Sequence, residues 1–262
     1  MNLHKLILTN NPCYKEGRTI KPKGVMVHST GANNPNLRRY VGPDDGLLGN
    51  NANKNHWNRS GLTVCVHAFI GKLKDGTVAT YQTLPWNHRG WHAGSGKKGS
   101  ANNTHIGFEI CEDGLTDRAY FEKVYREAVE LVAMLCKEYK LDPLADGVVI
   151  CHCEGAKRGI ASNHADVLHW WPKHGKNMDT FRADVAELLG VSEDDSGVPF
   201  KVRVKATNLN IRSGPGIGYK RVSYIKPGVY TIVDVQEGRG ASAWYKLKSG
   251  AGWIAADYAE KI

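Results

Sequence analysis

Two histidines and an aspartate follow one short apolar run in the second half of the chain. Residues 148–151 lead into His152, and His164 and Asp166 come after a connection that contains glycine. A second apolar run, residues 24–27, leads into His28. Imidazole nitrogens and carboxylate oxygens bind zinc, and catalytic zinc sites take three protein ligands and leave one position for water. We therefore consider a metal site with two ligands from residues 152–166 and His28 as the third.

Spacing alone does not establish such a site, because eleven histidines are scattered through the chain. No compact motif such as H-E-x-x-H joins the three candidates. A histidine outside such a motif is more often a surface residue or a hydrogen-bonded core residue than a ligand. The fold must therefore bring distant segments together.

The elements that would position these residues alternate between strands and helices. Five apolar runs predict strands: residues 24–28, 62–70, 77–83, 104–112 and 148–152. Residues 31–60, rich in Asn and Gly, predict a loop. Apolar residues recur every three or four positions in residues 117–139 and 179–189, which predicts two amphipathic helices, and Gly190 suits a helix stop. The pattern indicates an α/β fold, a mixed sheet flanked by helices, with the strand 148–152 near its centre.

At the candidate ligands the chain resembles the zinc-dependent N-acetylmuramoyl-L-alanine amidases of the amidase-2 type, which are related to peptidoglycan recognition proteins and phage amidase lysins. In that family one His closes an early strand, a second His follows a late strand, and an Asp or Cys lies two residues after a polar or cationic residue. These positions read His28, His152, Asp166 and His164 here. The resemblance covers residues 20–190 and implies a Zn²⁺ ion held by His28, His152 and Asp166.

Further segments carry the same resemblance. Residues 106–109 read Ile-Gly-Phe-Glu, like the family strand whose Glu acts beside the zinc, so the resemblance implies that Glu109 is the general base. By strand alternation alone, Glu109 would instead face solvent. Residues 66–78 resemble the family's His-aromatic strand and hairpin, and residues 91–94 its substrate-cleft loop. Candidate substrate contacts are therefore Trp91, His92 and His67, although either histidine could be structural. Four tryptophans could line a groove or pack in the core: Trp86, Trp91, Trp170 and Trp171.

The reaction implied by the resemblance is amide hydrolysis. Zinc would polarise the scissile carbonyl and lower the pKa of its water towards ~7. Glu109 would carry the proton from that water to the departing amine. His164 would face the developing oxyanion, where a donor or cation is worth roughly 3 kcal/mol of barrier. Many relatives have lysine at this position, so an alternative stays open in which His164 binds zinc and Asp166 orients it.

The composition, 41% hydrophobic and 23% charged, is that of a soluble globular protein. No apolar run is long enough to span a membrane. The N-terminus lacks a signal-peptide pattern, so we expect synthesis in the cytoplasm and action on the cell wall after release. The six cysteines are then expected to be reduced thiols, with Cys153 as a core thiol or a neighbour of the ligands, since adjacent strand residues point to opposite faces.

After Gly190 the composition changes. Residues 191–200 are acidic and lack apolar periodicity, which predicts a linker. Residues 201–262 carry 11 Lys and Arg against 4 Asp and Glu, and alternating runs between Gly and Pro turns predict a small all-β barrel. Residues 209–216 and 252–254 resemble bacterial SH3 domains, which bind cell-wall peptidoglycan. The aromatic side chains for a binding groove, some of which must fill the core, are Tyr219, Tyr224, Trp244, Tyr245, Trp253 and Tyr258.

We therefore predict a zinc amidase catalytic domain in residues 1–190, a linker in 191–200 and an SH3-like wall-binding domain in 201–262. Such a protein would cleave the amide bond between N-acetylmuramic acid and L-alanine of the stem peptide, as a phage endolysin or a bacterial autolysin. The alternative is a non-catalytic peptidoglycan-binding recognition protein. A basic chain can also bind nucleic acid, but we expect no nucleic-acid partner because aromatic and basic residues interleave only in part. The oligomeric state is not indicated.

Overall fold

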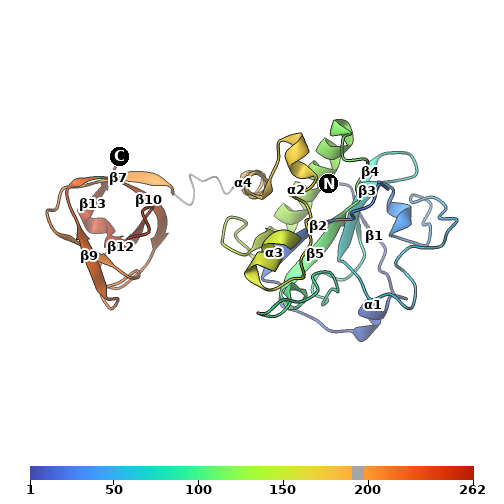
Figure 1. Cartoon of the computed structure of the whole chain (residues 1–262), viewed down its shortest axis with the longest axis horizontal. Helices are drawn as coiled ribbons and strands as arrows, with labels where there is room; N and C mark the ends of the chain where they lie inside the picture. Colours follow the sequence, from blue (N-terminus) through green and yellow to red (C-terminus); the bar gives the residue numbers. More distant parts are fainter. Residues whose placement is uncertain (191–197) are drawn as a thin grey trace. The chain divides into compact units, whose positions relative to one another are not determined.

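The computed structural model describes residues 1–190 and 198–262, which fall into two compact units, Met1–Gly190 and Val191–Ile262 (Figure 1). Residues 191–197 of the predicted linker lie outside the described residues. Strand β7 (Phe200–Val204) begins within the predicted linker, and Val198 and Phe200 pack against the core of the second unit. The predicted linker is therefore too long at its C-terminal end, because Val198 and Phe200 bury apolar surface against this core.

A six-stranded mixed sheet forms the centre of the first unit. Its strands are β1 (Leu3–Lys5), β2 (Gly24–Ser29), β3 (Ala68–Lys72), β4 (Val78–Gln82), β5 (His105–Ile110) and β6 (Val149–Cys151), in the order β1-β4-β3-β5-β2-β6. Strands β3, β5, β2 and β6 run parallel to one another, and β3 and β4 form the expected antiparallel hairpin. Parallel strands carry their carboxyl ends to one edge of the sheet, so the residues that end β2 and follow β6 meet there.

The predicted central place of the strand around 148–152 is wrong. β6 is a three-residue edge strand, and β2 and β5 lie inside the sheet. The chain turns into helix α3 (His152–Arg158) directly after Cys151, so His152 is the first residue of a helix and does not end a strand. The side chain of Glu154 accepts a hydrogen bond from the backbone N–H of Cys151 at 3.1 Å, which helps to start the helix at this point.

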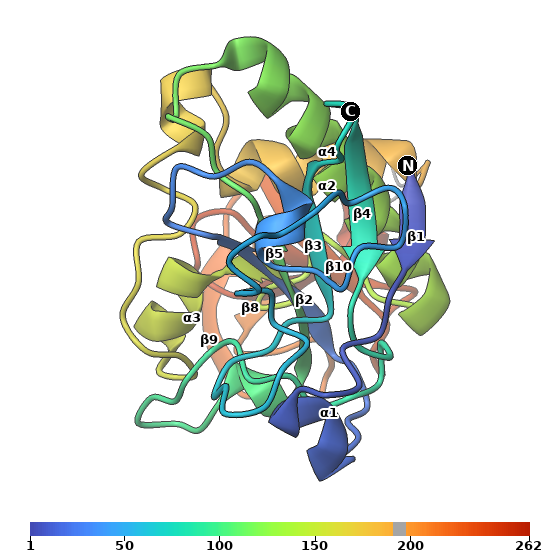
Figure 2. The same ribbon diagram turned by 90° about the vertical axis from the view of Figure 1, so that its right-hand side faces the viewer.

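Four α-helices and three short 3-10 helices accompany the sheet in the described part of the first unit (Figure 2). They are α1 (Pro12–Glu16), α2 (Arg118–Tyr139), α3, α4 (Met178–Leu188), η1 (Leu37–Arg39), η2 (Ala101–Asn103) and η3 (Trp171–His174). The two long helices confirm the periodicity prediction to within one residue at either end. Asp117 begins α2 because its carboxylate accepts a hydrogen bond from the Tyr120 N–H at 3.0 Å.

The apolar stripe of α2 packs on the sheet and on α4. Trp170 and Trp171 are fully buried in this core, in ring contact with Phe121 and Phe181 respectively. Trp86 is partly buried against the same core. These three tryptophans are therefore packing residues, and only Trp91 of the four remains available to a groove.

The second unit is a seven-stranded, entirely antiparallel sheet, in agreement with the predicted small barrel. Its elements are β7, β8 (Leu209–Arg212), β9 (Arg221–Ile225), β10 (Gly228–Gln236), β11 (Trp244–Leu247), β12 (Trp253–Ala255), η4 (Ala256–Tyr258) and β13 (Ala259–Lys261), with strand order β13-β7-β10-β11-β12-β8-β9. Trp244 and Trp253 are buried, whereas Tyr219, Tyr224 and Tyr258 are exposed. The tyrosines, not the tryptophans, are thus the aromatic residues that a partner could contact.

None of the helices in residues 1–190 and 198–262 is long and apolar enough to cross a membrane.

Candidate metal centre and groove

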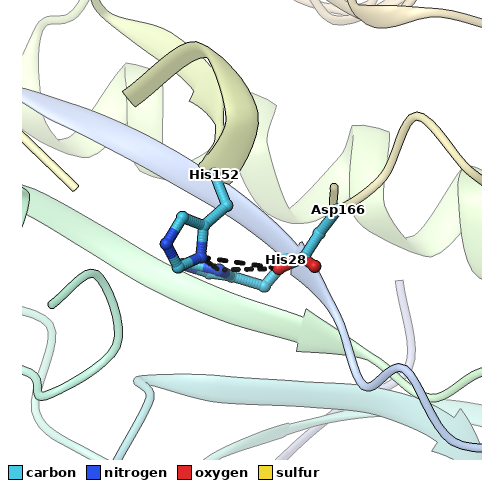
Figure 3. A group of neighbouring side chains, drawn as sticks. All are labelled: His28, His152 and Asp166. Carbon is cyan, nitrogen blue, oxygen red and sulfur yellow. Dashed lines mark hydrogen bonds and ion pairs between the residues drawn. The ribbon is translucent and has the colours of Figure 1, made fainter. Parts of the chain in front are cut away.

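The three proposed ligands converge at the carboxyl ends of β2 and β6 (Figure 3). His28 lies on β2, His152 begins α3, and Asp166 lies in the loop after α3. The Nδ1 atoms of His28 and His152 are 3.0 Å apart, and Oδ2 of Asp166 lies 3.4 Å from the first and 3.5 Å from the second. Folding alone brings these three residues together, because 138 positions separate His28 from Asp166.

This triangle of donor atoms has the dimensions of a metal site. Ligands at ~2.0–2.1 Å from a tetrahedral zinc ion lie about 3.3–3.4 Å from one another, close to the three separations given above. His28 is fully buried and His152 nearly so. Burial lowers the pKa of His28, which favours the neutral ring that binds metals. Burial opposes ionisation of Asp166, but the adjacent rings of His152 and His28 hold its pKa well below the usual range. The group can therefore hold a divalent metal ion.

The group contains Asp166 and not His164. His164 is exposed, with its ring centroid 4.5 Å from that of His152, and it lines the groove above the ligands. The alternative in which His164 is the ligand is not the arrangement seen. Cys153 also lies outside the group. Cys153 follows His152 in a helix and not in the predicted strand, so strand alternation is not what separates it from the ligands.

Glu109 faces the same site from the neighbouring strand. It is paired with His28 in the β2–β5 register, and its Oε2 is buried without a hydrogen-bond partner. Burial, the carboxylate of Asp166 and the carboxylate of Glu112 raise its pKa well above the usual value. A solvent-facing strand residue would show neither feature. An unpaired buried carboxyl group beside a ligand set is costly to keep, and such perturbed groups gather at functional sites.

A groove of about 610 Å³ opens over these residues. Most of its lining residues have polar side chains. The lining comprises Thr63, Val64, Arg89, Trp91, His92, Gly94, Ser95, Ser100, Asn102, Glu109, His152, Ser162, His164 and Asp166. Trp91 lies in the wall, where its Nε1 donates to Glu16 at 2.9 Å. Sequence reasoning missed Arg89, Asn102 and Ser162, since a single polar residue in a loop carries no spacing signature.

His67 does not contact the groove, contrary to the prediction. Its side chain is fully buried, its Nε2 donates to the carbonyl of His88 at 2.8 Å, and its Nδ1 accepts from the N–H of Gly107 at 3.0 Å. Both ring nitrogens are thus used to join β5 to the loop before Trp91. Strand β3 begins only at Ala68, so the predicted strand 62–70 started too early.

Acid should destabilise the first unit through His67. Burial lowers its pKa from 6.5 to about 4, so the unfolded chain binds a proton that the folded chain excludes. Stability is then complete above the unfolded pKa and falls as the pH drops towards the folded pKa, by about 3 kcal/mol in all. Urea unfolding between these pH values measures the slope. His67→Gln should reduce that slope; an unchanged slope would show that other groups cause the acid sensitivity.

Comparison with known proteins agrees with this architecture. Residues 18–169 match the family model of N-acetylmuramoyl-L-alanine amidases, and residues 207–260 match that of bacterial SH3 domains. The chain is 47% identical over 58 residues to N-acetylmuramoyl-L-alanine amidase CwlH of Bacillus subtilis strain 168, which is 22% of either protein. It is 44% identical over 61 residues to amidase XlyA of the same organism, or 23% of this chain and 19% of XlyA. The matches thus span about a fifth of these curated relatives.

Among solved structures, the Staphylococcus aureus hydrolase AmiA, determined in complex with its ligand, superposes with a TM-score of 0.53. The superposition covers 73% of this chain and 85% of that one at 18% identity, and at this identity the likeness shows the fold. The family model, in contrast, spans more than half of the sequence and includes His28, Glu109, His152 and Asp166. This protein therefore belongs to the amidase-2 family of N-acetylmuramoyl-L-alanine amidases.

Proposed function

We propose that this protein is a zinc-dependent peptidoglycan hydrolase that cleaves the amide bond between N-acetylmuramic acid and L-alanine of the stem peptide. The observation that carries the proposal is the site itself. Two buried imidazole nitrogens and an ionised carboxylate form a triangle of zinc-site dimensions at the groove, with the carboxyl group of Glu109 beside them. Membership of the amidase family is the reason for assigning the amide bond as the one that is cleaved.

His28, His152 and Asp166 would hold the zinc ion. When bound, the ion would supply Lewis acidity towards the scissile carbonyl and towards a water molecule. Glu109 takes the proton of the attacking water and delivers it to the departing amine, for which its raised pKa suits it. His164 donates to the carbonyl oxygen as negative charge develops there, since its ring lies exposed beside His152.

A recognition protein that binds peptidoglycan without cutting it is the alternative, and the complete ligand set with Glu109 argues against it. The test is release of free amino groups from purified walls. We expect release by the zinc-loaded protein, loss after chelation and recovery when zinc is restored. Binding to walls with no amine release under any of these conditions would favour the recognition protein.

The role of His164 gives a separate prediction. His164→Ala should lower turnover by ~10²-fold or more, because a donor to the developing oxyanion is lost. His164→Lys should retain measurable turnover, since the ammonium group also donates. Zinc content should stay the same in both variants, because His164 is outside the ligand group. Loss of zinc from His164→Ala would make this residue a ligand, and parent-like turnover would remove it from the mechanism.

The second unit, we propose, holds the enzyme at the wall. It carries most of the basic excess of the chain and exposes Tyr219, Tyr224 and Tyr258. Binding through this unit raises the local concentration of the first unit at its substrate. Residues 1–190 alone should therefore cleave soluble fragments at the parent rate but lyse intact cells poorly.

Co-sedimentation of residues 198–262 with purified walls tests the second unit directly. Rising salt should release part of the bound protein, the fraction held by charge, and leave the fraction held by aromatic contacts. Failure to sediment at low salt, or full lysis by residues 1–190, would show that this unit is not the anchor.

A further inference from the structure

Each histidine ligand is hydrogen-bonded, through the ring nitrogen that faces away from the metal site, to one short segment of the groove wall. Nε2 of His28 lies 2.9 Å from Nδ1 of His92, and Nε2 of His152 lies 3.2 Å from Oγ of Ser162. Oγ of Ser162 in turn donates to the carbonyl of Ala93 at 3.3 Å. Both chains of hydrogen bonds thus reach two residues that are adjacent in sequence, His92 and Ala93.

The position of the hydrogen on His28 follows from its partners. Nε2 of His92 lies 3.2 Å from the carbonyl oxygen of His105, which can only accept, so Nε2 of His92 carries the hydrogen. A neutral imidazole ring that carries its hydrogen on Nε2 has a lone pair on Nδ1. The Nδ1 of His92 is therefore an acceptor, and Nε2 of His28 must donate to it. The Nδ1 of His28 is left with a bare lone pair that faces Asp166.

The same elimination applies to His152. The single hydrogen of the Ser162 hydroxyl goes to the carbonyl of Ala93, so Oγ accepts from Nε2 of His152. The Nδ1 of a neutral His152 then also carries a lone pair. Two lone pairs and a carboxylate oxygen meet within 3.0–3.5 Å, with no hydrogen between the two nitrogens. A cation between these atoms relieves the repulsion.

One buried side chain holds the segment in place. Oδ1 of Asn102 accepts from the backbone N–H groups of both His92 and Ala93, at 2.9 and 2.8 Å. Asn102 is buried in η2, where Oγ of Ser100 accepts from its backbone N–H.

Two glycines make room for this arrangement. A Cβ on Gly107 would lie 2.4 Å from Cγ of His92, and a Cβ on Gly94 would lie 2.7 Å from Oγ of Ser162. Gly94 also has a φ of +62°, a region that L side chains rarely adopt. Neither position therefore tolerates a side chain without displacing a partner of a ligand.

We propose that the His92–Ala93 segment, held by Asn102, sets the tautomer of both histidine ligands, so that His92, Ser162 and Asn102 are positioning residues that determine metal affinity. The inference rests on the metal site of the proposed function but not on amide hydrolysis. Outer partners of this kind are worth roughly 10–100-fold in metal affinity.

Zinc affinity of the full chain, measured by competition with a chelating dye, is the first test. Ser162→Ala should weaken zinc binding roughly 10–100-fold, whereas Ser162→Thr, which keeps the hydroxyl group, should bind like the parent. Asn102→Ala should weaken it as well, and Asn102→Asp, which keeps an oxygen acceptor, should weaken it less. Ser60→Ala is the control, because Ser60 is an exposed serine that does not line the groove. Parent-like affinity of Ser162→Ala would overturn the proposal.

The second test reads the tautomers directly, by long-range ¹H–¹⁵N spectra of the metal-free protein above the ordinary histidine pKa. The parent should show His28 and His152 each with the hydrogen on Nε2 alone. Ser162→Ala should give a mixture at His152 and leave His28 unchanged, a pattern that general destabilisation does not produce. A mixture at both ligands in the parent would overturn the proposal, even if Asn102→Ala fails to fold. If the parent protein has these tautomers and binds zinc tightly but releases no amine from walls, only the proposed function is contradicted.

Discussion

Glu109→Gln should lower turnover by ~10²–10⁴-fold while the protein keeps its zinc. The amide of glutamine has nearly the shape of the carboxyl group but cannot take a proton from water. No metal ligand is removed, because Glu109 is outside the ligand group. Steady-state amine release and metal analysis on the same preparation measure the two quantities. Glu122→Gln, the same change at an exposed position of α2, is the control.

The pH profile of turnover separates a base from a merely structural carboxyl group. Burial raises the pKa of Glu109, and the carboxylates of Asp166 and Glu112 raise it further. Since the base acts when deprotonated, turnover should fall at acidic pH as Glu109 gains a proton. Glu112→Gln removes one negative charge, should lower the pKa of Glu109, and should extend activity to lower pH. Parent-like turnover of Glu109→Gln would show that Glu109 is not the general base.

Removal of Asp166 should have the other large effect. Asp166→Ala removes the anionic ligand and leaves two imidazoles, so zinc affinity should fall by more than the roughly 10–100-fold typical of losing an outer partner. Amine release should drop to background at zinc concentrations that saturate the parent. The control is Asp146→Ala, at an exposed carboxylate that pairs with Arg158 on the surface. An Asp166→Ala protein with full zinc content and full activity would show that another residue completes the site.

The ligand set illustrates how far sequence reasoning reaches. His28 stands at the end of an apolar run that does form a buried strand, because six consecutive buried residues suit the interior of a parallel sheet. His152 belongs to the group of possible ligands, but the sequence predicted the wrong local structure for it, since a three-residue strand that turns directly into a helix has no periodicity. The family resemblance, and not spacing, selected Asp166 over His164.

Other features depend on contacts that no local pattern encodes. β6 lies at the edge of the sheet because it pairs with β2 alone, and this pairing depends on tertiary contacts that the local sequence does not encode. His67 resembles a cleft residue in sequence, yet both of its ring nitrogens bind backbone groups. Ser162 and Asn102 are separated by 60 positions from each other and meet only through the His92–Ala93 segment. Sequence patterns for turns and strands extend over a few residues, whereas these hydrogen bonds join residues that are far apart in the sequence.

Mass spectrometry of peptidoglycan digested by the zinc-loaded protein tests the central claim most directly. If the site hydrolyses the amide bond at L-alanine, the products are stem peptides with a free L-alanine amino group and glycan strands without new reducing ends. Both should accumulate with digestion time and be absent with Glu109→Gln. New reducing sugars without free L-alanine would mean that a glycosidic bond is cut, and would contradict the account.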